Sequence, residues 1–582
     1  MRGRMLLIVV VLAVLVAASS ATADPSGRGP LGFKISFASS VRNAPVTGRM
    51  YVIVSRSSED EPRFQIDVTD GVPFWGKNVS GLQPDQVVVL SSGDSEVYGY
   101  PLPSLDQLPP GNYYVQAFLN VYTRFQRSDG SVVWLHMPCG DGQNPFDSPG
   151  NLYSGVVPVH LNPAASGTVK LTLDRVIEPA QPVPPGGTCQ QGNPSDTAHV
   201  KHVKIQSELL SGFWGTPIHI GANILLPEGY ESDTSTRYPV VYRQGHFPRG
   251  NPFGFREDLG NSFSRWWVSP DAPRMIVVEI RHENPYYDDS YAVNSANLGP
   301  YGDAIAQELI PYIDANFRTI PERSARTLTG GSTGGWEALA QMVFYPDTYA
   351  GTWALCPDPV DFRFHQLVNV YEDPNAYFTQ HEWLNVPRPS AREVSGDTIW
   401  TMEEENHWEA ALGTNGRSGL GQWDIWQVVY GPQGPDGYPA PIWDKFTGEI
   451  DHSVAQGWHG MDIRLYLESN WPSLGPKLTD RVHIFTGDDD TFFLNDAVEL
   501  LEAAVANLKD PPANFEFQYG HNQPHCWSPY TNPELLTIIY SAMTTGGSSA
   551  LASGQAAEGA QTTVTPGSHV FRELDNRSGA MN

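Results

Sequence analysis

The stretch Gly330-Gly331-Ser332-Thr333-Gly334-Gly335 decides how the sequence around it is interpreted. It directly follows a strand-like run at 325–329 and directly precedes an apolar run that contains Ala338 and Met342. A serine between glycines, at the turn from a strand to a helix, is typical of a nucleophile elbow, because this turn is too sharp for most side chains. We therefore expect Ser332 to be a nucleophile. The alternative is an ordinary glycine-rich turn at the start of a helix.

Strand-like and helix-like runs alternate on both sides of this motif. This alternation predicts an α/β fold with a mostly parallel central sheet that helices cover on both faces. Such a sheet binds ligands outside the carboxyl ends of its strands. The expected strands are 203–209, 219–226, 238–243, 274–280, 325–329, 351–355, 481–486 and 514–519, and the expected helices include 304–316, 496–508 and 534–543.

A nucleophilic serine needs a positioned base and a further group that orients the base. In hydrolases built on a strand–turn–helix elbow, both groups follow the serine in the chain, at the ends of later strands. The expected strand at 481–486 is followed by Gly487 and then by Asp488, Asp489 and Asp490. Asp490 fits a Gly-x-x-Asp loop best and is our candidate acid, with Asp488 and Asp489 as alternatives.

Two histidines, His521 and His525, follow the expected strand at 514–519, and either could reach the elbow as the base. The tetrahedral intermediate of acyl transfer also needs two backbone N–H donors. We assign one donor to Thr333, directly after the serine. The other is assigned to Phe247, in the loop that follows the expected strand at 238–243.

The four cysteines are candidates for disulfides if the protein is exported. Pairing within each part of the chain, Cys139 with Cys189 and Cys356 with Cys526, is the simplest of three connectivities, but the sequence does not choose among them. Two strand spacings separate the second pair by nearly 10 Å, beyond the roughly 7 Å limit for a disulfide, unless the loops lean together. Two buried free thiols are therefore the alternative. No spacing fits zinc or a calcium loop, so we expect no metal and no cofactor.

Composition limits the classes of partner. The chain has 582 residues, 40% of them apolar, and a formal charge of -28. It is therefore long and apolar enough for several globular domains, and its acidity disfavours nucleic acid and anionic membranes as partners.

The N-terminus predicts a cleaved signal peptide at 1–23 and a secreted protein. It contains the basic residues Arg2 and Arg4, a short apolar run at 6–16 and the small residues of Ala21-Thr22-Ala23.

The remaining sequence divides into parts of different character. Residues 24–178 hold short strand-like runs separated by Gly, Pro, Asn and Asp, which predict an all-β, sandwich-like domain. A Pro/Gly-rich linker follows at 179–198, and the α/β domain extends over 199–544. Within it, the composition of 357–478 predicts a long irregular insertion rich in Trp, which we expect to be a lid or a binding segment. The tail at 545–582 is expected to be disordered.

Several motifs of the α/β part resemble one known family. The motifs are Tyr238-Pro239-Val240-Val241-Tyr242, the segment 289–301, 308–313, 326–335 and Tyr345-Pro346-Asp347. They look like the esterase D type of putative esterase, a family that includes feruloyl and acetylxylan esterases, enterochelin esterases, S-formylglutathione hydrolases and mycolyl transferases. The resemblance covers about 199–357 and 480–543. It implies an α/β-hydrolase fold.

The resemblance also selects the base. In this family the catalytic histidine is often followed two positions later by Trp, which favours His525, with Trp527, over His521. Together with the signal-like sequence at 1–23, the resemblance then implies a secreted serine hydrolase that cleaves a small or polymer-linked carboxylic ester through an acyl-enzyme on Ser332, with His525 as the base and Asp490 as the acid that orients it. Alternatives are an acyl transferase to a sugar or lipid hydroxyl, a peptidase, and a catalytically inactive secreted protein that binds carbohydrate.

Overall fold

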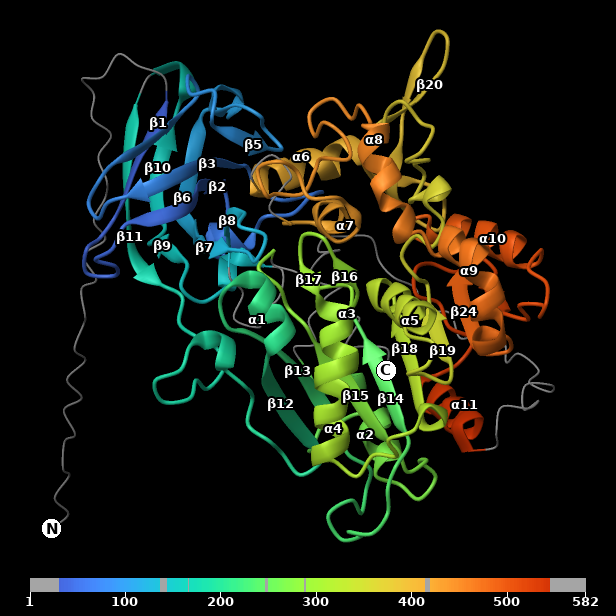
Figure 1. Ribbon diagram of the computed structural model, residues 1–582. Helices are drawn as coiled ribbons and strands as arrows, with labels where there is room; N and C mark the ends of the chain where they lie inside the picture. Colours follow the sequence, from blue (N-terminus) through green and yellow to red (C-terminus); the bar gives the residue numbers. More distant parts are fainter. Residues whose placement is uncertain are drawn as a thin grey trace, which may run out of the picture.

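The computed structural model describes residues 31–136, 144–165, 167–245, 250–286, 289–413 and 419–544. The expected signal peptide at 1–23 and the expected tail at 545–582 lie outside these ranges, as do Cys139 and Phe247. The described chain forms an N-terminal β domain and a C-terminal α/β domain (Figure 1). This is the fold class that the sequence predicts.

The N-terminal domain is built mainly from strands. Its main strands are β1 (Gly32–Phe37), β2 (Val46–Ser55), β3 (Phe74–Leu82), β4 (Val88–Ser91), β5 (Tyr98–Tyr100), β6 (Gly111–Val121), β9 (Leu152–Ser154), β10 (Val157–Leu161) and β11 (Thr168–Val176). Within the described ranges, hydrogen bonds join these strands into one nine-stranded sheet, ordered β4-β1-β11-β9-β6-β2-β3-β5, with β10 paired to β6. A separate hairpin consists of β7 (Thr123–Gln126) and β8 (Val132–Leu135).

Side chains from the strands of the N-terminal sheet pack into a hydrophobic core. The strands alternate inward and outward side chains, so every second residue of β1, Phe33, Ile35 and Phe37, is fully buried in this core. Val169, Leu171 and Leu173 of β11 join the core from the neighbouring strand. These strands therefore bury every second side chain, as expected for strands with one face against a core.

The C-terminal domain is centred on a second sheet. Its strands are β12 (Val200–Ser207), β13 (Ile218–Leu225), β14 (Val240–Gln244), β15 (Ile276–Arg281), β18 (Arg326–Gly331), β19 (Thr352–Leu355), β24 (Val482–Gly487) and β25 (Glu516–Gly520). Among the described residues they form an eight-stranded sheet in the order β12-β13-β15-β14-β18-β19-β24-β25. The two pairings of β13 are antiparallel, and every pairing from β15 to β25 is parallel. The mostly parallel sheet is thus confirmed.

Helices cover both faces of this sheet. Along β14, Val240 and Tyr242 point into one core and Val241 points into the other. The helices are α1 (Glu208–Trp214), α2 (Ser262–Trp267), α3 (Tyr301–Ala304), α4 (Ile310–Asn316), α5 (Thr333–Phe344), α10 (Leu494–Val505) and α11 (Asn532–Thr544), and a π-helical turn, Ile305–Leu309, joins α3 to α4. α2 and α11 pack on one face, whereas α4, α5 and α10 pack on the other.

The segment at 357–478 is not irregular, and that prediction is wrong. It contains α6 (Met402–Leu412), α7 (Gln422–Tyr430), α8 (His452–Ala455), α9 (Ile463–Leu478) and two hairpins, β20 (Phe378–Gln380) with β21 (Asn385–Pro387) and β22 (Pro389–Arg392) with β23 (Thr398–Thr401). Gly, Pro and Trp interrupt any simple period, but most of the tryptophans are core residues. At most 3% of the surface of Trp400, Trp423, Trp426, Trp443, Trp458 and Trp471 is exposed.

The insertion packs directly on the N-terminal sheet. Ala411, Leu412 and Leu420 form a buried cluster with Tyr51 and Phe118 of that sheet. The Tyr51 hydroxyl also donates a hydrogen bond to the Leu412 carbonyl. In Figure 1, α6 and α7 accordingly lie between the N-terminal sheet and the rest of the α/β domain. The two domains therefore share a packed interface.

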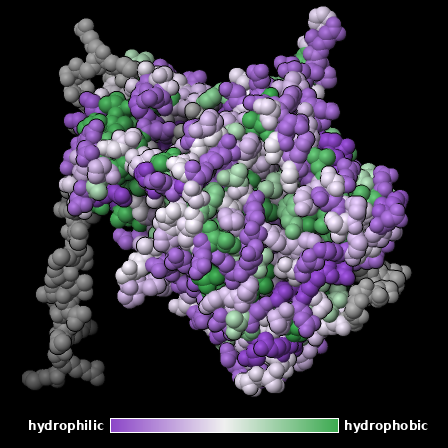
Figure 2. Space-filling model, viewed as in Figure 1, coloured by the Kyte–Doolittle hydropathy of each residue, from purple (hydrophilic) through white to green (hydrophobic). Residues whose placement is uncertain are grey.

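The visible surface is predominantly polar. On the face shown in Figure 2, hydrophilic residues cover most of the area and apolar residues occur in scattered groups. Scattered apolar residues of this kind are normal for a folded domain. Within the part of the chain that the structure describes, no helix combines the length and the apolar character needed to span a bilayer.

Candidate active site

Ser332 lies in a strained turn between β18 and α5. Its backbone angles are φ 57° and ψ -126°, which residues other than glycine rarely adopt. Gly330 and Gly334 are required by close packing. A Cβ atom on Gly330 would lie 2.2 Å from the Gly334 carbonyl oxygen, and one on Gly334 would lie 2.2 Å from the Gln244 carbonyl oxygen. The sequence motif therefore forms the sharp elbow that it predicts.

The structure brings Ser332, His525 and Asp490 together. His525 lies in the loop after β25, and its Nε2 atom is 2.9 Å from the Ser332 Oγ atom. On the other side of the ring, Nδ1 is 2.8 Å from Oδ2 of Asp490, which lies in the loop after β24. The Asp490 side chain is fully buried and 8% of the His525 side chain is exposed. The three groups thus form a continuous line from carboxylate to imidazole to hydroxyl.

Backbone groups hold the Asp490 carboxylate in place. Its Oδ1 atom accepts hydrogen bonds from the backbone N–H groups of Phe492, at 2.9 Å, and Leu494, at 3.3 Å. Leu494 is the first residue of α10, so the negative charge also lies at a helix N-terminus. One oxygen is therefore fixed by the main chain, and the other is directed at His525.

The environment of His525 favours its protonated form. Burial alone would lower the pKa of this imidazole, but the charge of Asp490, its hydrogen bond and the charge of Asp358 outweigh burial and raise the pKa above its ordinary value of 6.5. The Phe492 ring packs edge-on against the imidazole, with the ring centroids 4.9 Å apart. His525 is thus poised to accept a proton from Ser332.

The alternative acids and the alternative base lie elsewhere. Asp488 pairs with His521, at 3.0 Å between Oδ2 and Nδ1, and 85% of the His521 side chain is exposed. Asp489 lies 3.8 Å from the guanidinium of Arg392. The geometry therefore favours Asp490 and His525 over the other candidates.

Of the two predicted oxyanion donors, Thr333 lies within the described residues. Thr333 is the first residue of α5 and is buried, so its backbone N–H belongs to the N-terminal turn of that helix, directly beside Ser332. A helix N-terminus stabilises negative charge. Phe247 lies outside the described residues, and its role stays a prediction.

A disulfide joins Cys356 to Cys526 beside the elbow. The Cα atoms are 4.8 Å apart, although the strands that precede them, β19 and β25, are separated by β24. The bridge forms because the loop after β25 folds back toward the elbow. The Cys356 Sγ atom also accepts a hydrogen bond from the Ser332 backbone N–H at 3.2 Å. The pairing of Cys139 with Cys189 stays a prediction, because Cys139 is not described.

A buried carboxylate that no sequence motif singles out lies beside the elbow. Asp358 lies just beyond β19, with 2% of its surface exposed, and its Oδ2 atom is 3.0 Å from the Thr333 Oγ1 atom. The signal that could have identified it is its position, because it follows a strand at the carboxyl edge where the catalytic candidates gather. Tyr291 and Trp426 also reach this carboxylate, from distant parts of the chain.

Among the described residues, two groups of side chains bring potential metal ligands together. Ligand atoms of the buried residues His282, Asp289 and Glu337 lie within 4.8 Å of one another. The other group contains Cys356, Cys526 and His525, but its two sulfur atoms are joined in the disulfide and do not act as thiolates. The sheet edge thus offers one buried set of nitrogen and oxygen ligands.

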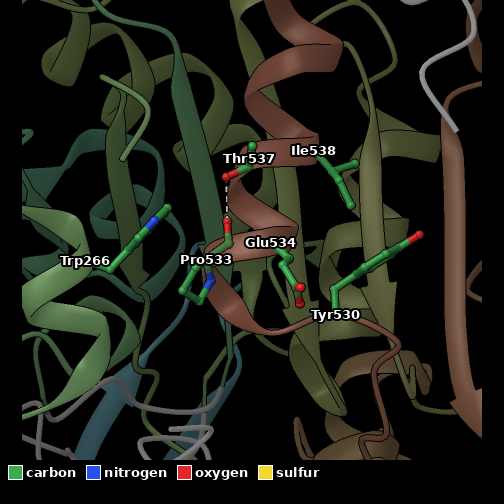
Figure 3. Close-up of a pocket in the computed structure, with 6 residues that line it drawn as sticks. All are labelled: Trp266, Tyr530, Pro533, Glu534, Thr537 and Ile538. Carbon is green, nitrogen blue, oxygen red and sulfur yellow. Dashed lines mark hydrogen bonds between the residues drawn. The ribbon is translucent and has the colours of Figure 1, made fainter. Parts of the chain in front are cut away.

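A pocket lies on a part of the surface that does not include Ser332. It is an open depression of about 380 Å³ between α2 and α11. Figure 3 shows the residues that line it: Trp266, Tyr530, Pro533, Glu534, Thr537 and Ile538. This lining contains neither the predicted nucleophile nor the predicted acid and base, so the pocket has no evident part in their chemistry.

The strand order, the elbow and the Ser332–His525–Asp490 arrangement define an α/β hydrolase. Comparison with known proteins gives the family. Residues 215–415 match the family model described as putative esterase, so the predicted resemblance is confirmed for this part of the chain. The matched part contains Ser332, whereas Asp490 and His525 lie beyond it.

Individual relatives are distant. Esterase Rv1288 of Mycobacterium tuberculosis is 30% identical over 132 residues, which make up 22% of this chain and 27% of that esterase. Among solved structures, a ferulic acid esterase shares 16% identity over 60% of this chain and 98% of its own, with a TM-score of 0.35. An S-formylglutathione hydrolase from Agrobacterium tumefaciens shares 13% identity over 61% of this chain and 95% of its own, with a TM-score of 0.31.

Proposed function

We propose that the protein is a secreted serine esterase, which cleaves carboxylic esters through an acyl-enzyme intermediate on Ser332. The observation that carries this proposal is the hydrogen-bonded line from Asp490 through His525 to Ser332. The match of residues 215–415 to the putative esterase family model supports an ester as the substrate. Secretion rests on the signal-like sequence at 1–23.

The arrangement assigns each group a role in acylation. Ser332 Oγ attacks the ester carbonyl carbon while His525 Nε2 takes its proton, and Asp490 orients the ring and stabilises the imidazolium that forms. The carbonyl oxygen becomes an oxyanion, which the backbone N–H of Thr333 stabilises at the start of α5. When the tetrahedral intermediate collapses, the C–O bond to the alcohol breaks and His525 returns the proton to the leaving oxygen.

Deacylation repeats these steps with water. His525 removes a proton from a water molecule, the resulting hydroxide attacks the acyl carbon, and the second tetrahedral intermediate releases the carboxylic acid from Ser332. His525 then returns its proton to Ser332 Oγ. The products are one alcohol and one carboxylic acid, and the free enzyme is restored.

The first test replaces the nucleophile. We expect Ser332→Ala to lower kcat/KM for a chromogenic short-chain ester by about three orders of magnitude or more, because binding and oxyanion contacts alone provide little catalysis. His521→Ala is the matched control, since His521 is exposed and lies outside the Ser332–His525–Asp490 line. Unchanged turnover in the Ser332 variant would refute the proposal.

A further inference from the structure

Asp358 is connected to the elbow through both its main chain and its side chain. Its backbone N–H donates a hydrogen bond to the Ser332 carbonyl oxygen at 3.3 Å. Its Oδ2 atom accepts a hydrogen bond from the hydroxyl of Thr333, the next residue, at 3.0 Å. A displacement of Asp358 would therefore move both the nucleophile and the residue whose backbone faces the oxyanion.

The same carboxylate oxygen reaches two other parts of the fold. It accepts hydrogen bonds from the Tyr291 hydroxyl, at 2.9 Å, and from the Trp426 indole N–H, at 3.0 Å. The Gln422 amide lies 2.5 Å from the Tyr291 oxygen and 3.4 Å from the carboxylate oxygen. Trp426 and Gln422 belong to α7 of the insertion. Asp358 thus joins the elbow to the insertion through buried hydrogen bonds.

The backbone around this junction is strained. Tyr291 has a φ of 56° and Cys356, two residues before Asp358, has a φ of 38°. Such values are unfavourable for residues with side chains and persist only where the surroundings hold them in place. Strained residues of this kind concentrate at sites that need fixed geometry, so their presence here supports a positioning role.

The charge of Asp358 also acts on His525. Asp490 and Asp358 are the charged groups that influence this imidazole, and both favour its protonated form. The third neighbour, Phe492, contributes an uncharged ring. Because the carboxylate is buried, its field is screened less than that of a surface group. The two negative charges therefore both stabilise the imidazolium that forms during acylation.

We propose that Asp358 is a positioning residue of the active site: it fixes Thr333 for oxyanion binding, stabilises the His525 imidazolium and couples the insertion helix α7 to the elbow. This inference rests on the proposed esterase function. Asp358 acts through Thr333 and His525 and has no assigned contact with the substrate. The Trp-rich insertion then contributes to catalysis through α7.

The decisive experiment is a pH profile of the full-length protein with Asp358→Asn. We expect kcat/KM for a chromogenic ester to fall about tenfold, and the midpoint of the acid limb to move down by roughly half a pH unit, because one charge that favours imidazolium is removed. Asp489→Asn is the matched control, since it removes the same charge beside the site, and it should leave both values unchanged. An unshifted acid limb in a folded Asp358→Asn variant would overturn the proposal.

A second variant keeps the test decisive if Asp358→Asn does not fold. Thr333→Val removes the hydroxyl and keeps the backbone N–H and the side-chain shape. We expect kcat to fall about fivefold with KM nearly unchanged, because a contact made in the transition state is disturbed. If the Asp358→Asn variant folds, the double variant should be no slower than Asp358→Asn alone, because the hydroxyl acts through the carboxylate. A Thr333→Val variant with wild-type kcat, or additive losses, would contradict the coupling.

The failure of this inference is distinguishable from failure of the proposed function. If the unaltered protein neither hydrolyses esters nor reacts with a fluorophosphonate, the esterase proposal fails and the inference fails with it. If the unaltered protein is active and the Asp358 and Thr333 variants retain its rate and pH profile, only the positioning role is wrong.

Discussion

At the scale of single residues, the chemistry depends on how burial and charge balance at His525. Burial disfavours the charged ring, and the nearby carboxylates Asp490 and Asp358 more than compensate. Because the general base must start neutral, the raised pKa of His525 sets the pH at which catalysis begins. The proposed esterase should therefore gain activity as the pH rises through that pKa.

We predict that the acid limb of the kcat/KM profile has its midpoint above 6.5, the ordinary pKa of histidine. The measurement is initial-rate kinetics with a chromogenic ester between about pH 5 and pH 9. A midpoint below 6.5 in the unaltered protein would contradict the account of the His525 environment.

Asp490→Asn should lower kcat by several orders of magnitude in the same assay, because it removes the orienting carboxylate and disfavours the reactive tautomer of His525.

The sequence was sufficient to propose the nucleophile and the acid, but less so for the base. Ser332 and Asp490 stand out because each follows a recognisable strand in a loop with characteristic glycines. His521 and His525 have similar local signals, and the choice between them came from Trp527. The structure offers a physical reason for that signal, since a Cβ on Gly520 would lie 2.4 Å from the Trp527 ring, which therefore packs tightly on the end of β25.

At the scale of elements, the elbow depends on main-chain atoms that approach one another too closely for side chains. The glycines of the elbow therefore differ in the space that an added Cβ atom would have. A Cβ on Gly334 would lie 2.2 Å from the Gln244 carbonyl oxygen, whereas one on Gly331 would lie 3.4 Å from its nearest neighbour, the Cys526 sulfur atom. The contact at Gly334 involves backbone, which cannot move without displacing β14.

We predict that Gly334→Ala destabilises the protein by about 1–3 kcal/mol or prevents folding, because the added methyl group overpacks the elbow. Gly331→Ala should cost much less, since its new contacts are of ordinary van der Waals length. Urea unfolding of the two purified variants, followed by ester hydrolysis, compares them directly. Equal stability of the two variants would show that close approach is not the reason for the glycine at 334.

The disulfide between Cys356 and Cys526 fixes two further elements beside the elbow. It connects the loop after β19, which carries Asp358, to the loop after β25, which carries His525, across 170 residues of sequence. Closing so long a loop restricts the unfolded chain strongly, and the bond also holds two active-site loops together.

We predict that replacing both Cys356 and Cys526 by Ala lowers the free energy of unfolding by about 2–5 kcal/mol and reduces kcat more than it raises KM. Thermal unfolding and steady-state kinetics under oxidising conditions provide the measurement. A double variant with unaltered stability and rate would argue that the bond is dispensable for the site.

The element prediction was accurate for the central sheet and failed for the insertion. The strands of the sheet are continuous apolar runs because both faces are buried, so they are easy to recognise. The helices of the insertion bury Trp, Asp and Glu together, as in α7, where Trp423, Asp424 and Trp426 are all buried. Contacts with residues distant in sequence offset the cost of burying these polar groups. One example is the ion pair between Lys445 Nζ and Asp424, which local sequence patterns do not reveal.

At the scale of the whole molecule, the N-terminal sheet supports the insertion that reaches the active site. The buried cluster around Tyr51, Phe118 and Leu412 connects that sheet to α6, and α7 follows with its contacts to Asp358. A chain of packed elements therefore extends from the N-terminal domain to the elbow. Nothing in the sequence of the N-terminal domain indicated this link, because it depends on long-range packing.

We predict that Leu412→Ala, at the interface between the two domains, destabilises the protein by about 2–4 kcal/mol and lowers esterase activity, because only 4% of Leu412 is exposed. Leu384→Ala is the matched control. Leu384 lies between β20 and β21 with 63% of its surface exposed, and its removal should change stability by less than about 0.5 kcal/mol. Equal effects of the two substitutions would contradict the supporting role of this interface.

If Ser332 is an activated nucleophile, it should react covalently with a fluorophosphonate probe. Intact-mass and peptide mass spectrometry of the labelled full-length protein should find one adduct, located on Ser332. The Ser332→Ala variant should remain unlabelled, and His525→Ala should react far more slowly. Labelling at another residue, or no labelling of folded protein, would contradict the account.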